Sequence, residues 1–250
     1  MRLLHTSTFC LQEFIHPPDY AILSHTWGAE EVTYQDLVLG DHEHMKGWSK
    51  VVNCCRKAAE DGWDFVWMDT CCIDKSSSAE LQEAINSMFR WYEDSGICYA
   101  FLQDVQNSCV AGDDTSFEEQ FVQSRWHTRG WCLQELLAPK FLLFLDQNWA
   151  EIGTRSSLSD LITQATNIIG DVIVSFRRGC NTAQIFSWAS SRQTTRVEDR
   201  AYSLLGLCNV ELPLLYGEGE KSFLRLQLEI IKSSDDMSIF AWIGRSFLSW

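Results

Sequence analysis

Polar and aromatic side chains that could bind or act on a small molecule gather at three places in the sequence. Carboxylates and histidines can transfer protons or stabilise charge, guanidinium groups match the geometry of phosphates, and tryptophans often line pockets. If the fold brings these places together, one crevice would hold a histidine, several carboxylates, two arginines and three tryptophans. The candidate site residues are Ser24, His25, Trp27 and Gly28, then Asp69 and Asp74, and finally Arg125, Arg129, Trp131 and Glu135.

Each of these residues also suits a structural role. His25 would suit a hydrogen-bonded position near the core, and Asp69 and Asp74 would suit caps of turns or of a following helix. The two arginines would suit solvated surface positions, and Trp131 would suit the core. By periodicity alone Glu135 is an ordinary exposed helix residue, because its leucine neighbours take the core-facing positions. In a chain of formal net charge −14, the arginines are nonetheless the best candidates for a phosphate site.

The elements that must position these residues alternate between strands and helices. Near-continuous apolar runs predict buried strands, and apolar residues at helical spacing, with capping and stop signals, predict helices. This alternation predicts an α/β fold with a parallel sheet flanked by helices, in which ligands bind beyond the carboxyl ends of the strands. The predicted strands cover residues 20–25, 65–68, 97–102 and 141–145, and the predicted helices cover 51–61, 77–95, 131–138, 197–208 and 220–232.

The two parts of the chain differ in their predicted structure. Residues 1–150 are predicted to form the α/β domain, and residues 151–250 a mainly helical extension packed on it. Residues 106–120 are polar and acidic, which predicts a loop. The apolar residues 247–250 suit packing or an interface.

Composition and charge exclude several classes of protein. A formal net charge of −14 argues against general nucleic-acid binding, because phosphates are neutralised by excess Lys and Arg. The sequence has no signal-peptide pattern and no run of about 18 apolar residues, which predicts a cytoplasmic protein without a membrane span. Its ten cysteines are then expected to stay reduced. Adjacent pairs such as Cys71-Cys72 do not suit a tetrahedral zinc site, so no metal is predicted.

The chain lacks the motifs of several common enzyme classes. It has no glycine-rich dinucleotide motif and no P-loop motif, and neither G-x-S-x-G nor H-E-x-x-H occurs. A cysteine–histidine hydrolase stays open as an alternative. Its nucleophile would be Cys71 or Cys72, and its base would be His25 or His127.

Three sequence blocks, in order and at suitable spacing, resemble the fungal heterokaryon-incompatibility (HET) domain. They are Y-A-I-L-S-H-T-W-G at residues 20–28, V-W-M-D-T-C-C-I-D-K at 66–75, and R-G-W-C-L-Q-E-L-L-A-P at 129–139. Residues 194–206 and 213–219 also resemble segments that commonly follow this domain. The resemblance implies a role in fungal non-self recognition and programmed cell death.

HET domains are in turn similar to Toll/interleukin-receptor (TIR) domains, and residues 131–136, W-C-L-Q-E-L, resemble the W-C-L-x-E-L run of plant TIR domains. The glutamate of that run is catalytic in NAD cleavage, so the resemblance assigns this role to Glu135. It also implies a TIR-like, flavodoxin-like sheet, NAD(P) as the substrate with no further cofactor, and a homo-oligomer on activation. The other candidate site residues are assigned to substrate binding by their placement alone.

A rival hypothesis gives the domain no chemistry. Many TIR domains are self-associating adaptors, and a fold does not determine a function. On this hypothesis the chain triggers incompatibility cell death by assembly, and the polar crevice is structural. On either hypothesis the resemblance implies an activating partner, such as an NLR-type or another incompatibility protein.

Overall fold

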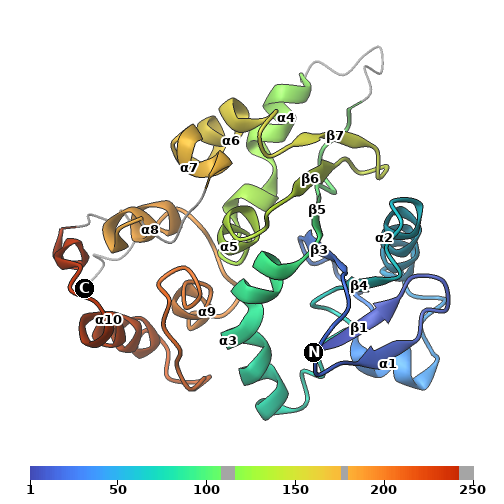
Figure 1. Cartoon of the computed structure of the whole chain (residues 1–250), viewed down its shortest axis with the longest axis horizontal. Coiled ribbons are helices and arrows are strands. Elements are labelled where there is room, and N and C mark those ends of the chain that lie inside the picture. Colours follow the sequence, from blue (N-terminus) through green and yellow to red (C-terminus); the bar gives the residue numbers. More distant parts are fainter. Residues whose placement is uncertain (108–115, 176–179, 242–250) are drawn as a thin grey trace.

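A mixed sheet runs through the middle of the molecule, whose computed structural model describes residues 1–107, 116–175 and 180–241 (Figure 1). In these residues the sheet has seven strands, in the order β2-β1-β4-β3-β5-β6-β7. The strands are β1 (Arg2–His5), β2 (Leu11–Glu13), β3 (Ala21–His25), β4 (Phe65–Trp67), β5 (Ile97–Phe101), β6 (Leu142–Leu145) and β7 (Glu151–Thr154).

The four central strands are parallel and are the ones that the sequence predicts. β3 pairs with β4 on one side and with β5 on the other, and β5 pairs with β6. All five residues of β3 are buried, as expected of a central strand that is covered on both faces. Numbered among themselves in chain order, these strands have the order 2-1-3-4, with which a flavodoxin-like sheet begins. The α/β fold is confirmed, and the closer likeness to TIR domains stays a prediction.

The edge strands of the sheet are not predicted from the sequence. β1 and β2 form an antiparallel hairpin whose first strand pairs with β4, and β7 pairs antiparallel with β6. These strands are three or four residues long, which is too short for a clear alternation of apolar and polar residues. Because β7 begins at Glu151, the sheet continues past residue 150. The division of the chain into two units at that point stays a prediction.

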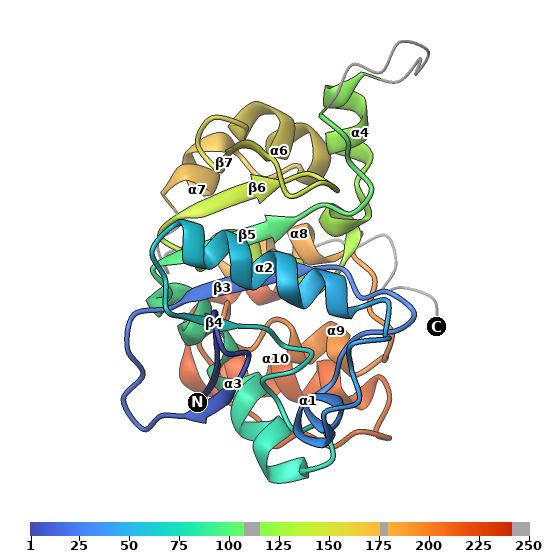
Figure 2. The same ribbon diagram turned by 90° about the vertical axis from the view of Figure 1, so that its right-hand side faces the viewer.

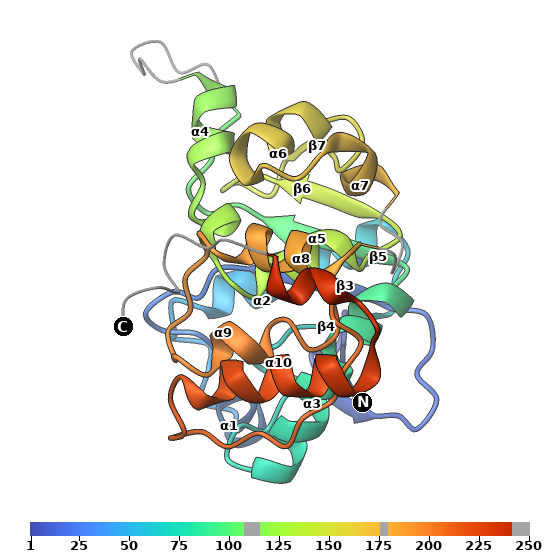
Figure 3. The same ribbon diagram turned by 90° about the vertical axis from the view of Figure 1, so that its left-hand side faces the viewer.

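Helices cover both faces of the sheet. α2 lies across one face (Figure 2), whereas α3, α5 and the C-terminal helices α8 to α10 lie on the other (Figure 3). No described helix has the length and apolar character needed to cross a membrane. The described helices are α1 (Tyr34–Leu39), α2 (Trp48–Glu60), α3 (Ser78–Asp94), α4 (Phe117–Gln123), α5 (Cys132–Leu137), α6 (Ser159–Thr166), α7 (Gly170–Val174), α8 (Thr182–Ala189), α9 (Asp199–Tyr202) and α10 (Lys221–Ser233), with short 3-10 helices η1 (Arg125–Thr128) and η2 (Met237–Phe240).

The long helix α3 begins where the sequence predicts. Ser77 Oγ accepts a hydrogen bond from the backbone N–H of Glu80 at 3.3 Å, which caps the first turn. The helix buries one apolar face against the sheet. Its Tyr92 hydroxyl donates to the carbonyl of Leu23 at 3.0 Å, so the helix is fixed to the central strand β3.

The predicted loop over 106–120 is wrong at its end. Helix α4 begins at Phe117, with a capping box at Ser116 that the loop prediction ignores. Residues 108–115 of the predicted loop, like the apolar ending 247–250, lie outside the described residues.

The predicted helix over 197–208 is also wrong, because only α9 is helical and residues 203–209 form turns. The chain passes very close to α3 here, since a Cβ built on Gly206 would lie 2.1 Å from Cβ of Phe89. This close packing, which a periodicity of apolar residues does not reveal, is the physical reason for the difference.

Replacing Gly206 with alanine should therefore destabilise the protein, because the added methyl group would overlap Phe89. Overpacking of this kind costs roughly 1–3 kcal/mol. Gly170→Ala is the matched control, since a Cβ there would meet nothing closer than Thr163 Oγ1 at 3.9 Å. Urea unfolding followed by tryptophan fluorescence measures both variants. Equal free energies of unfolding would contradict the packing of this turn on α3.

Candidate active site

A cleft of about 620 Å³ opens at the carboxyl ends of the parallel strands β3 and β4. Its size is that of a small-molecule pocket, and residues that follow β3, β4 and β5 line it, as expected for this kind of sheet. The candidate residues that lie in its lining are Trp27, Asp69, Arg125, Arg129, Trp131 and Glu135.

A chain of hydrogen bonds leads from the core to the carboxyl group of Glu135. Ser24 Oγ donates to Glu135 Oε2 at 2.5 Å, and the indole N–H of Trp126 donates to Ser24 Oγ at 2.7 Å. Ser24 and Trp126 are fully buried, whereas Glu135 lines the cleft with 7% of its surface exposed. Because Trp126 occupies an acceptor position of the serine oxygen, the hydroxyl hydrogen is directed toward the carboxylate. Ser24 therefore positions Glu135 and is itself out of a ligand's reach.

Burial gives Glu135 unusual acid–base properties. It raises the pKa of this carboxyl to about 7, although the hydrogen bond from Ser24 and the charge of Arg129 act in the opposite direction. Removal from water disfavours the ionised form of a carboxylic acid. The alternative of an ordinary exposed helix residue is wrong, because α5 packs against β3, α3 and η1 and all of its residues are buried. The group thus changes its charge near neutral pH, as many catalytic carboxylates do.

Trp27, Asp69 and Lys75 form a linked group in the cleft lining. The Trp27 indole N–H donates to Asp69 Oδ2 at 2.8 Å, and Lys75 Nζ lies 3.6 Å from the centre of the Trp27 ring. Burial alone would raise the pKa of Asp69, but the charges of Lys75 and Arg129 and the bond from Trp27 outweigh it and lower that pKa. Asp69 is therefore ionised, and Trp27, 43% exposed, is open to a ligand. Lys75 is absent from the predicted site.

His25 and Gly28 lie outside the cleft lining. His25 Nε2 is 3.8 Å from Asp69 Oδ1 and 3.9 Å from Glu31 Oε2, and neither ring nitrogen has a hydrogen-bond partner among the described residues. Burial lowers the pKa of His25 to about 4, so its imidazole is neutral at pH 7. Gly28 is exposed, and its N–H donates to Glu31 Oε1 at 2.5 Å. Both residues support the loop after β3 rather than face a ligand in the cleft.

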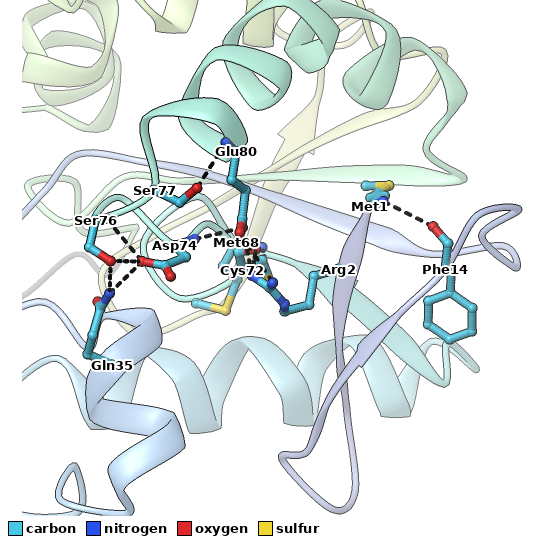
Figure 4. Close-up of polar contacts among 10 residues, drawn as sticks. All are labelled: Met1, Arg2, Phe14, Gln35, Met68, Cys72, Asp74, Ser76, Ser77 and Glu80. Carbon is cyan, nitrogen blue, oxygen red and sulfur yellow. Dashed lines mark hydrogen bonds and ion pairs between the residues drawn. The ribbon is translucent and has the colours of Figure 1, made fainter.

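Asp74 also lies outside the cleft lining, in the turn before α3 (Figure 4). Its Oδ1 accepts hydrogen bonds from Gln35 Nε2 at 2.5 Å and from Ser76 Oγ at 2.6 Å. The backbone N–H of Asp74 donates to Glu80 Oε1 at 2.8 Å, and Arg2 forms an ion pair with the same oxygen at 2.7 Å. These contacts join β1, α1 and the start of α3, which is the structural role that the sequence also allows.

The two candidate arginines, Arg125 and Arg129, have different surroundings. Arg125 is exposed, and its Nε lies 3.6 Å from Asp104 Oδ2. Arg129 is half-buried, and within the described residues its guanidinium forms no ion pair with a carboxylate. Trp131 also lines the cleft, and its indole forms a hydrogen bond with the side chain of Asp199. Arg129 is thus the cation in this loop that is most available to an anionic ligand.

One wall of the cleft is not predicted from the sequence. It comes from the C-terminal third of the chain and includes Gln193, Thr194, Arg196, Asp199 and Tyr216. Residues 194–206 and 213–219 resemble segments that commonly follow the HET domain, but this resemblance does not predict that they line a cleft. Their role depends on contacts with residues far away in the sequence.

The cysteine–histidine alternative lacks the geometry that it needs. A hydrogen bond to Cys72 and burial raise the pKa of Cys71 well above its ordinary value. The Cys72 sulfur accepts the N–H of Met68 at 3.4 Å and lies in the core. Burial lowers the pKa of His127 to about 3, and neither ring nitrogen of His25 has a hydrogen-bond partner in the part of the chain that the structure describes. The described residues therefore contain no thiolate–imidazole pair of the kind such an enzyme requires.

Comparisons with known proteins place the chain among incompatibility proteins. Residues 20–114 match the family described as Heterokaryon incompatibility protein (HET). The chain is 47% identical over 224 residues to the Vegetative incompatibility protein HET-E-1 of Podospora anserina, and the match covers 86% of this chain and 16% of that protein. The chain thus spans a small part of that relative's length. No solved structure matches it.

The raised pKa of Glu135 makes a prediction about stability. The pKa of Glu135 is about 7 in the folded chain, whereas an ordinary glutamate, as in the unfolded chain, has a pKa of 4.5. The folded protein therefore binds this proton more tightly than the unfolded chain does. The resulting cost to stability is absent below pH 4.5, grows as the pH rises, and is complete above pH 7. At about 1.4 kcal/mol per pH unit, it reaches on the order of 3 kcal/mol.

Glu135→Gln should therefore be more stable than the wild type at pH 8, and the difference should largely vanish at pH 5. Glutamine has no charge to bury and can still accept the Ser24 hydrogen bond. Urea unfolding at both pH values measures the effect, with Glu83→Gln as the control at an exposed position on α3. The same difference at pH 5 and pH 8 would contradict the raised pKa.

Proposed function

The chain belongs to the heterokaryon incompatibility (HET) family, and from this premise we propose that it is a fungal cell-death effector that hydrolyses the nicotinamide–ribose bond of NAD(P). Its relative from Podospora anserina is named a vegetative incompatibility protein. That name supports a role for this chain in the rejection of non-self partners. The chemistry of the cleft supports the proposed reaction.

The proposed reaction places few demands on acid–base catalysis. Nicotinamide is cationic in NAD and leaves as a neutral molecule when its bond to ribose C1′ breaks, so no general acid is required. Positive charge then builds up on the ribose ring, as in glycoside hydrolysis, where a nearby carboxylate stabilises it. Water bonds to C1′ and loses a proton, so that NAD⁺ and water give ADP-ribose, nicotinamide and H⁺.

One observation carries the proposal: Glu135 lines the cleft, and its carboxyl group accepts a hydrogen bond from the fully buried Ser24. A fixed charge that is largely shielded from water stabilises a developing opposite charge better than a solvated one. The bond from Ser24 keeps the carboxylate in one orientation, so little reorganisation is needed when the ribose becomes positive. A single glutamate can therefore supply the main catalytic effect.

The other residues of the cleft bind and orient the substrate in this proposal. Trp27, which is 43% exposed and lines the cleft, contacts a ring of the substrate, and Asp69 holds its indole in place. Arg125 and Arg129 supply guanidinium groups for the pyrophosphate. His25, Gly28 and Asp74 receive no substrate contact, because they lie outside the cleft lining.

We also propose that the active form is a cytoplasmic homo-oligomer, triggered by an NLR-type or another incompatibility protein. Leu224, Leu228 and Ile231 are spaced three or four residues apart on α10, and each is about half exposed. An apolar stripe of this kind favours association with another surface. The enzymatic assay should therefore use a high protein concentration.

The purified chain should release nicotinamide from NAD, and Glu135→Ala should slow the release roughly 100- to 1,000-fold, the usual loss when one stabilising group is removed. Chromatographic detection of nicotinamide measures the rate. Glu83→Ala, at an exposed position outside the cleft, is the control. No release from the wild type at any concentration would favour the rival adaptor hypothesis. A folded Glu135→Ala variant with the wild-type rate would refute the role of this residue.

The rate should also depend on pH in a defined way. The ionised carboxylate is the form that stabilises positive charge, so kcat should rise with pH through about 7 and then level off. Ser24→Ala removes a hydrogen bond that lowers the Glu135 pKa, so the midpoint should move to higher pH. The control is Ser7→Ala, at an exposed position. Identical midpoints in wild type and Ser24→Ala would show that Ser24 does not control the reacting carboxylate.

A further inference from the structure

The C-terminal wall of the cleft is firmly attached to the loop that carries Arg129. The N–H of Gln193 donates to the carbonyl of Thr128 at 2.6 Å, and its own carbonyl accepts the N–H of Gly130 at 2.8 Å. These bonds form a short parallel bridge between Arg129 and Gln193. A Cβ on Gly130 would lie 2.5 Å from Thr194 Cγ2, so the two segments approach as closely as a glycine permits. The wall is therefore a fixed part of the cleft.

Within this wall, Arg196 is held above an aromatic ring. Its guanidinium carbon lies 4.4 Å from the centre of the Tyr216 ring. The Tyr216 hydroxyl donates to Asp199 Oδ1 at 2.9 Å, and the backbone N–H groups of Gly217 and Gly219 both donate to Glu198 Oε1, at 2.8 Å and 3.0 Å. These bonds fix the ring on which Arg196 rests. Stacking on a ring restricts a guanidinium without using its hydrogen-bond donors.

Arg196 and Arg129 are both available to an anion. Arg196 is exposed, Arg129 is half-buried, and within residues 1–107, 116–175 and 180–241 neither guanidinium forms an ion pair with a carboxylate. The bridge between Arg129 and Gln193 places the two arginines on adjoining segments of one cleft. Two guanidinium groups in such an arrangement match a ligand with two linked phosphates.

The charged residues of the whole cleft also favour a ligand with phosphate groups. The cleft lining contains four basic side chains and three carboxyl groups, and burial raises the pKa of two of those carboxyls, Glu135 and Asp199. Basic side chains therefore outnumber carboxyl groups in the lining, although the chain has a formal net charge of −14. The basic side chains are Lys75, Arg125, Arg129 and Arg196.

We propose that Arg196, supported by Tyr216, binds a phosphate of a nucleoside diphosphate ligand, so that the segment 193–199 completes the nucleotide site. This inference rests on the proposed function, because it assigns the ADP-ribosyl part of NAD(P) to the C-terminal wall. Arg196 then joins Arg125 and Arg129 at the pyrophosphate, while Glu135 faces the ribose whose bond is cleaved. Arg196 is a binding residue, and Tyr216 is a positioning residue.

The test is calorimetric titration of the full chain with ADP-ribose, which contains both phosphates and undergoes no cleavage of a nicotinamide bond. Arg196→Gln should weaken binding roughly 10- to 100-fold, the effect of losing charge-assisted hydrogen bonds. Tyr216→Leu should weaken it less, whereas Tyr216→Phe should keep the supporting ring and most of the affinity. Arg56→Gln, on the exposed side of α2 and 61% exposed, is the control for net charge. Thermal melts confirm that each variant is folded.

The outcomes separate this inference from the proposed reaction. If wild type binds ADP-ribose and Arg196→Gln binds it equally well, the inference is overturned, whether or not the chain cleaves NAD. If binding depends on Arg196 but the wild type releases no nicotinamide, the nucleotide site stands and the proposed reaction fails. If the wild type binds no ADP-ribose at millimolar concentration, the inference is overturned, and nicotinamide release alone then decides the proposed reaction.

Discussion

The carboxyl group of Glu135, buried and held by the side chains of Ser24 and Cys132, is the constraint on which the rest of this structure depends. A buried carboxylate is destabilising unless hydrogen-bonding partners satisfy it. Here Cys132 is one partner, and Ser24, which Trp126 holds in turn, is another. These residues belong to β3, η1 and α5, so their contact requires the central strand, the loop after β5 and a short helix to meet at one point. The raised pKa of Glu135 shows that burial of the ionised carboxylate lowers the stability of the folded chain.

The helix α5 shows how the C-terminal part of the chain supports that contact. Six residues are too few for a helix to be stable by itself. Arg155 donates to the carbonyl of Leu136 at 2.8 Å and so satisfies the end of the helix. Before its start, Arg192 donates to the carbonyl of Arg129 at 3.0 Å. Both of these arginines are buried. Residues 1–150 therefore supply Ser24 and Glu135, and later segments hold them in place.

Much of this frame could be predicted from the sequence, because the four parallel strands and α3 each bury a long apolar surface that local patterns reveal. The edge strands and the wall around Arg196 could not, since they depend on contacts between distant segments. Periodicity alone predicts that Glu135 is an exposed helix residue, and only the resemblance to TIR domains assigns it a catalytic role. Neighbours in sequence also diverge in space: the turn after β4 directs Asp74 toward Gln35 and places Lys75 over Trp27.

The most direct test of a reacting carboxyl group at this position is a pH titration of the Glu135 carboxyl carbon by ¹³C NMR, with and without ADP-ribose. A midpoint near 7 in the free protein is expected, together with a change in the signal when ADP-ribose binds. A midpoint near 4.5, the ordinary value for this side chain, and a signal that ADP-ribose leaves unchanged would contradict both the burial of this group and its place in a nucleotide site.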